Sequence, residues 1–171
     1  MDPAPVDDLV GALTRGGADR IESRRLDTLT GRWSAVTEWE PVVGRGVRRS
    51  ESTVEVAWIL ARRVLEARSI DPDGVEISRF LVAFDPSRGD YAAFAASVLS
   101  SHFEVERGQF DEDVGALVLH GEERGPVHDP LIRYRRTVRI VDDDTFTIDI
   151  SYPDVPPGTY GPMLITHTRA G

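Results

Sequence analysis

The feature that most constrains the fold is a series of short segments, from Leu29 onward, in which apolar and polar residues alternate. Turn residues separate them, most clearly Asp-Pro-Asp-Gly at 71–74 and Asp-Asp-Asp at 142–144. Alanines in the segment 91–101 also favour a helix by propensity, but the flanking turns favour a strand. The alternation predicts about ten strands: 31–43, 52–60, 64–70, 75–84, 91–101, 103–107, 116–123, 131–141, 145–152 and 163–168.

No segment of helical periodicity separates these strands, so neighbours along the chain are expected to pair antiparallel. A half-buried antiparallel sheet of this size hides its edges by closing on itself or by splitting into a sandwich. Closure is the simpler solution. The sequence therefore predicts a mainly β fold, a single antiparallel up-and-down β-barrel over residues 29–171.

Residues 1–28 are expected to form a short helical extension before the barrel. Val6, Leu9, Val10 and Leu13 have helical spacing, and two glycines at 16–17 end the run. A second short helix is predicted within 18–29. Pairing of two barrels through this extension would make a homodimer, which is one possible assembly.

Composition narrows the partners and the compartment. The chain has 29 acidic and 20 basic residues and a net charge of −9, which argues against nucleic acid or an anionic membrane as partner. It contains no cysteine, so disulfides and thiolate metal sites are excluded. Its first residues are acidic and lack a long apolar run, so we expect a cytoplasmic protein. The excess of Arg over Lys is typical of a high-GC bacterial genome.

Two features predict a cavity inside the barrel. In the predicted strand phases, Trp33, Trp39 and Trp58 all project inward. Trp33 is expected to pack under the cavity, whereas Trp58 either lines a ligand site or packs in the core. The alanine-rich segment 91–97 places small side chains along one wall, which leaves volume for a ligand.

Several fragments, in order along the chain, resemble a bacterial family known as domain of unknown function 1579, whose fold is related to the lipocalins and fatty-acid-binding proteins. The fragments are Gly-Arg-Trp at 31–33, Trp-Ile-Leu-Ala-Arg-Arg at 58–63, Phe-Asp-Pro at 84–86 followed by Tyr91 and Phe94, Tyr-Arg at 134–135, and Ile-Thr-His-Thr-Arg at 165–169. The resemblance covers roughly residues 26–169. It implies a lipocalin-like barrel, and it points to Arg63 and Arg135 as interior arginines.

An interior arginine would identify the polar end of a ligand. The apolar phase of the strand that begins at Leu131 places Tyr134 and Arg136 inside, in place of Arg135. Fatty-acid-binding barrels hold a carboxylate with interior Arg and Tyr, so such a pair would suggest an acidic, lipid-like ligand. The alternative is that a carboxylate of the protein, Glu66 or Glu122, pairs with the arginine.

The four histidines are far apart in sequence and lack metal-ligand spacing, so we expect no metal site and no cofactor. His167 stays open as the proximal ligand of a haem-binding barrel. His102, with Tyr91, Glu104 or Glu122 as partner, could carry out general acid-base chemistry.

Together these features predict a barrel that binds a small hydrophobic or amphipathic molecule. Its expected walls and anchors are Trp39, Trp58, Arg63, Phe94, His102, Tyr134 and either Arg135 or Arg136. The alternative is a cofactor-independent cyclase or isomerase of bacterial specialised metabolism, in which a shaped cavity folds a reactive intermediate.

Overall fold

The structure, a computed structural model, describes residues 20–41, 43–98, 103–124, 131–156 and 158–171. The described residues form ten strands: β1 (Gly31–Trp39), β2 (Arg48–Ile59), β3 (Val64–Ile70), β4 (Glu76–Asp85), β5 (Asp90–Ser97), β6 (Glu104–Asp111), β7 (Ala116–Arg124), β8 (Leu131–Asp142), β9 (Thr145–Ser151) and β10 (Met163–Arg169). Each predicted strand has a counterpart. The largest differences in boundary are four residues: β1 and β5 end four residues early, β2 begins four residues early, and β6 ends four residues late.

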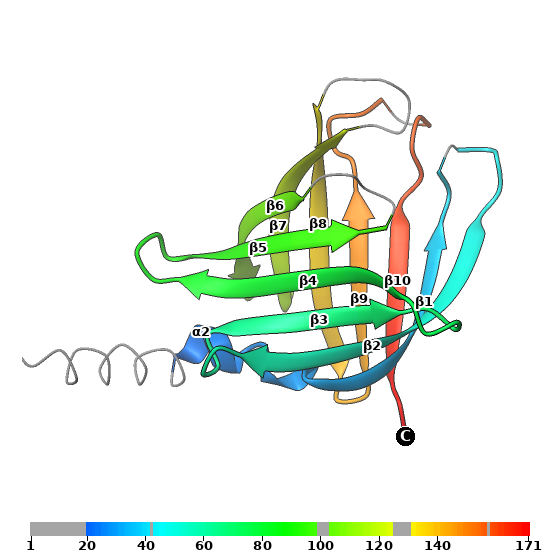
Figure 1. Cartoon of the computed structure of the whole chain (residues 1–171). Coiled ribbons are helices and arrows are strands. Elements are labelled where there is room, and N and C mark those ends of the chain that lie inside the picture. The colour runs from blue at the N-terminus through cyan, green and yellow to red at the C-terminus, as the bar shows by residue number, and fades with distance from the viewer. Residues whose placement is uncertain (1–19, 42, 99–102, 125–130, 157) are drawn as a thin grey trace, which may run out of the picture.

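The strands form a closed antiparallel barrel, as predicted. Each strand pairs with its neighbours along the chain, and β1 pairs with β10 to complete the ring, with Trp33 opposite Arg169 and Trp39 opposite Met163. In Figure 1, β2 to β5 cross the front of the barrel, and β8 to β10 run behind them at a steep angle. Closure removes the open sheet edges that ten half-buried strands would otherwise expose.

A short helical segment caps one end of the barrel. It comprises helix α2 (Ile21–Arg24) and the 3₁₀ helix η1 (Asp27–Leu29), so the second predicted helix is present, whereas the first lies outside the described residues. Leu26 and Leu29 are buried in the core. The Trp33 indole N–H donates to the Leu29 carbonyl at 2.9 Å. The cap is therefore held to the barrel by both apolar burial and hydrogen bonds.

The turn between β2 and β3 is tight and left-handed. Leu60, Ala61 and Arg62 have φ values of 50°, 52° and 62°, in the region that favours glycine. A non-glycine residue there costs about 1 kcal/mol or more. Arg62 offsets part of this cost, because its guanidinium lies over the Trp58 ring and forms an ion pair with Asp27 at 2.6 Å. The turn is thus tied to the helical cap.

Candidate functional site

The barrel encloses a cavity of about 160 Å³. Its lining residues come from the cap, from β1 to β4 and from β7 to β10, and most of them are aliphatic or small. A cavity of about 150 Å³ with apolar walls holds a benzene-sized molecule. The cavity therefore has room for a single ring. A haem porphyrin, for which His167 was considered as the proximal ligand, is larger, so the strands would have to move apart to admit it.

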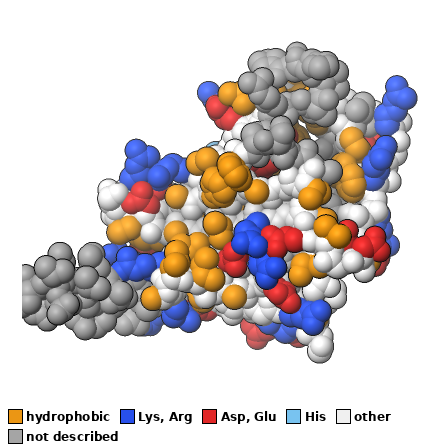
Figure 2. Space-filling view, viewed as in Figure 1, with side chains coloured by type: hydrophobic (Ala, Val, Ile, Leu, Met, Phe, Trp, Pro, Cys, Tyr) orange, Lys and Arg blue, Asp and Glu red, His pale blue; other side chains and the backbone are white. Residues whose placement is uncertain are grey.

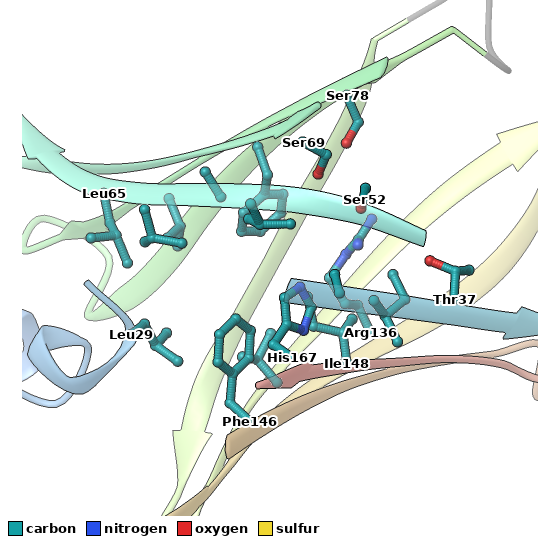
Figure 3. A pocket seen from close by; sticks show the side chains of 18 of the residues that line it. Leu29, Thr37, Ser52, Leu65, Ser69, Ser78, Arg136, Phe146, Ile148 and His167 are labelled. Carbon is teal, nitrogen blue, oxygen red and sulfur yellow. The ribbon is translucent and has the colours of Figure 1, made fainter. Parts of the chain in front are cut away.

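The cavity is polarised along its length. Near the cap its lining side chains include Leu29, Leu65 and Phe146, and toward the opposite end they include Thr37, Ser52, Ser69 and Ser78, which present hydroxyl groups, together with Arg136 (Figure 3). We call the four hydroxyl-bearing residues the hydroxyl end. Hydroxyls both donate and accept hydrogen bonds without carrying charge. The lining therefore suits a molecule with an apolar body and an uncharged polar end.

The alanine-rich strand β5 does not open the cavity, which corrects the expectation from sequence. Ala93 and Ala95 point inward and are buried, but they are not among the residues that line the cavity. In register, Ala93 lies opposite Glu106 and Ala95 opposite Glu104. The room beside these alanines is used by charged side chains of β6.

A buried ion pair lies on this side of the barrel. Glu106 is completely buried, and the Arg136 Nε donates to both of its carboxylate oxygens, at 2.9 and 3.0 Å. The Tyr134 hydroxyl donates to Glu106 at 2.8 Å. Glu104 lies 3.5 Å from the Arg136 Nη2, and the guanidinium lies over the Phe80 ring. Arg136 is therefore an interior arginine already paired with a carboxylate of the protein.

The charge states of this cluster follow from its burial. Burial alone would lower the pKa of Arg136, but the Glu106 carboxylate outweighs it and the pKa is raised, so Arg136 stays charged. Burial raises the pKa of Tyr134, and the neighbouring Glu106 raises it further, so the hydroxyl stays protonated and donates. Burial also raises the pKa of Glu104, against the opposing effect of Arg136.

His167 is the second titratable residue among those that line the cavity. It lies on β10, is 3 % exposed, and stacks on Phe146 with ring centroids 3.9 Å apart. Burial lowers its pKa to about 4, so the imidazole is neutral at pH 7. Its Nδ1 atom has no hydrogen-bond partner among the described residues.

The predicted tryptophans lie away from the cavity lining. Trp58 is partly buried against the core, and its indole N–H donates to Asp27 of the cap at 2.7 Å. Trp33 is 1 % exposed and packs edge-on against Phe146, the packing role expected for it. Trp39 is half-buried near the end of β1. Trp58 and Trp39 thus stay predictions as ligand-binding residues, without a place in this lining.

The other predicted site residues divide by strand phase. Tyr134 and Arg136 point inward, as the apolar phase of β8 predicted, and Arg136 lines the cavity. Arg135 and Arg63, to which the resemblance pointed, are exposed.

Phe94 points outward, where it packs on Phe103 and contributes with Val98 and Val105 to the exposed apolar side chains of this region. Figure 2 shows hydrophobic side chains gathered over the middle of this face. His102 lies outside the described residues.

Sequence reasoning missed Glu106, because the local pattern points the other way. Phe103 and Val105 supply the apolar phase of 103–107, yet both are exposed, and the alternating glutamates, Glu104 and Glu106, face inward. Gly108 and Phe110 share the inward phase of Glu106. If the predicted strand is extended to Phe110, apolar residues occupy both of its alternating faces. This conflict is the sequence signal that could have shown that the face of Glu106 points inward.

Among the residues that the structure describes, the chemistry of the cavity is limited. An enzyme of the cyclase or isomerase type needs an acid and a base at the substrate. The titratable groups of the described lining are Arg136, which is paired, and His167. No group of three or more His, Asp or Glu residues that could hold a metal is found in the described ranges. Nor does any described helix have the length and apolar character needed to cross a membrane.

Comparisons with known proteins support the fold. A protein-family model described as "Protein of unknown function (DUF1579)" matches residues 19–167. A search of curated proteins finds no match. The crystal structure of Rv2717c from M. tuberculosis is similar at a TM-score of 0.58 and 16 % identity, covering 89 % of this chain and 99 % of that chain. The S-type phycobiliprotein lyase CPES from Guillardia theta also has a TM-score of 0.58, at 9 % identity, covering 92 % and 97 % of the two chains. At these identities the likeness shows the barrel fold alone.

Proposed function

The chain belongs to the family described as protein of unknown function DUF1579, and on that premise we propose that it binds a small, uncharged, amphipathic molecule inside the barrel. The observation that carries the proposal is the cavity of about 160 Å³, apolar near the cap and hydroxyl-lined at the other end. Its size favours a ligand built on a single ring or a short chain. Larger ligands occupy pockets of about 300 Å³ or more.

The ion pair with Glu106 is the reason to favour an uncharged ligand over a carboxylate. A carboxylate that approached Arg136 would meet a guanidinium already held by Glu106, with Glu104 beside it. Two carboxylates against one guanidinium leave this side of the barrel short of positive charge. A third carboxylate, from a ligand, would be desolvated here without a free cation to pair with.

A binding experiment with two probes of the same shape tests the charge preference. Isothermal titration calorimetry at pH 7 should show saturable binding of benzamide. Benzoate should bind at least about tenfold more weakly, which corresponds to a difference of about 1.4 kcal/mol in binding free energy. Glu106→Gln removes the competing carboxylate, so it should narrow or reverse that order. If wild-type protein prefers benzoate, Arg136 anchors the ligand and the uncharged class is wrong.

A pair of alanine variants tests whether the ligand occupies this cavity. Ala67 lines the cavity on β3, so Ala67→Leu fills part of it and should weaken benzamide binding at least about tenfold. Ala57 is exposed on the adjacent strand β2, and Ala57→Leu serves as the matched control that leaves binding unchanged. Equal loss in both variants, or no saturable binding to the wild-type protein, would overturn the proposed function.

A further inference from the structure

The Arg136 guanidinium has one nitrogen without a partner in the described protein. Its Nε donates to Glu106, and its Nη2 lies 2.8 Å from the same carboxylate and 3.5 Å from Glu104. The remaining nitrogen, Nη1, makes no hydrogen bond or ion pair with the described residues, yet it is not fully buried. A guanidinium carries five N–H donors, two of them on this nitrogen. The ion pair therefore compensates the charge of Arg136 without using all of its donors.

The guanidinium reaches across the barrel toward the hydroxyl end. Arg136 projects inward from β8, and its guanidinium carbon lies 5.1 Å from the centroid of the Phe80 ring on β4. Ser78 is two residues before Phe80 on the same strand, so their side chains share the inward face about 7 Å apart. All three residues line the cavity, and in Figure 3 the Arg136 nitrogens lie toward Ser52 and Ser78. A ligand at this end therefore meets both Arg136 and Ser78.

The Ser78 hydroxyl is also available to a ligand. Ser78 lies directly opposite Ser69 on β3, a position in which cross-strand hydroxyls often bond to each other. Neither hydroxyl makes a hydrogen bond with the described residues, and neither oxygen is fully buried. Hydroxyls can donate or accept, whereas the guanidinium can only donate, and the described cavity lining contains no carboxylate. The polar end of the cavity is thus richer in donors than in acceptors.

We propose that Arg136 Nη1 and the Ser78 hydroxyl together recognise a carbonyl oxygen on the ligand. Such an oxygen has two lone pairs for two donors, and it carries no net charge that would compete with Glu106. The ligand class is a small neutral carbonyl compound, such as a ketone, an amide or an ester, with its apolar body toward the cap. This inference rests on the proposed function, because it assumes that the cavity is occupied. It goes further, since it assigns the polar contact to two residues and to one functional group.

Acetophenone and α-methylstyrene test this assignment, because they have nearly the same shape and differ in C=O against C=CH₂. The ratio of acetophenone to α-methylstyrene affinity is measured by calorimetry in wild-type protein and in variants. Arg136→Lys keeps a cation beside Glu106 and removes Nη1, so the ratio should fall at least about tenfold. Ser78→Ala removes one neutral donor, so the ratio should fall about fivefold. The matched controls are Arg133→Lys and Ser34→Ala at exposed positions, in which the ratio should keep its wild-type value.

A spectroscopic measurement keeps the proposal testable should Arg136→Lys fold poorly. A ketone carbon resonates further downfield when its oxygen accepts hydrogen bonds, so acetophenone labelled with ¹³C at the carbonyl should resonate well downfield of its position in hexane when bound to wild-type protein. Ser78→Ala should move the bound resonance back toward the hexane position, and Ser34→Ala should leave it in place.

Two kinds of result would overturn the carbonyl recognition and leave the proposed function intact. One is an unchanged affinity ratio in Ser78→Ala or in a folded Arg136→Lys. The other is a bound resonance of wild-type protein at the hexane position. If neither probe nor benzamide binds, the proposed function itself fails.

Discussion

Breaking the Glu106–Arg136 pair is expected to destabilise the barrel strongly. Arg136→Met leaves the fully buried Glu106 carboxylate with the Tyr134 hydroxyl but without its guanidinium. Removing one member of a buried ion pair costs about 3–5 kcal/mol, because the other charge stays desolvated. Glu106→Gln should cost less, since Glu104 lies 3.5 Å from the Arg136 Nη2 and takes over part of the pairing.

The measurement is urea unfolding at pH 7, followed by tryptophan fluorescence. Arg133→Met on the same strand is the matched control, because its side chain is 72 % exposed and lies 3.7 Å from Glu122. Such a surface pair is worth less than about 1 kcal/mol. The double variant Arg136→Met/Glu106→Leu replaces both charges with apolar groups and should recover most of the loss. Losses of equal size in Arg136→Met and Arg133→Met would refute the account of the buried pair.

Two further outcomes are expected. The folded pKa of His167, about 4, lies below its ordinary value of 6.5, so the unfolded chain binds the extra proton between these pH values, and stability falls as pH drops through that window. The shifted pKa is worth about 3 kcal/mol in the free energy of unfolding. When pH is lowered from 7 to 4.5, the free energy of unfolding of wild type should fall more than that of His167→Phe, by most of this amount. Equal losses in the two proteins would contradict the shifted pKa. A Cβ at Gly108 would lie 1.8 Å from the Val118 carbonyl oxygen, so Gly108→Ala should lower the free energy of unfolding by about 1–3 kcal/mol or more, measured by urea unfolding, and a neutral effect would contradict the close approach of β6 and β7.

The barrel could be predicted from sequence because its signals are local. Val64–Ile70 matches the predicted third strand residue for residue, since the turn at 60–62 and the Asp-Pro-Asp-Gly turn at 71–74 bound it on both sides. Regular alternation in β8 also gave the correct inward face, with Tyr134 and Arg136 inside. Side-chain alternation has a period of two, so a strand with one clear apolar phase fixes which residues enter the barrel.

The place of the cavity was not predictable in the same way, because it depends on what opposite walls contribute. The alanines of β5 line one wall with small side chains, as expected. Glu104 and Glu106 of the adjacent strand lie beside them and pair with Arg136, so these side chains fill the space. The open volume lies instead beside Ala35, Ala67 and the serines of β2 to β4. No single strand carries this information, since a wall of small residues becomes a cavity only if no long side chain from elsewhere reaches into it.

The buried pair also changes what Arg136 can do inside the barrel. An interior arginine with a nearby tyrosine reads, strand by strand, as an anion anchor, and the resemblance to fatty-acid-binding barrels strengthens that interpretation. In the folded barrel the same arginine is neutralised by Glu106, and Tyr134 donates to the same carboxylate. Two polar groups that suggested a ligand site are thereby used within the protein. A ligand carboxylate would therefore compete with Glu106 for the guanidinium of the described cavity lining.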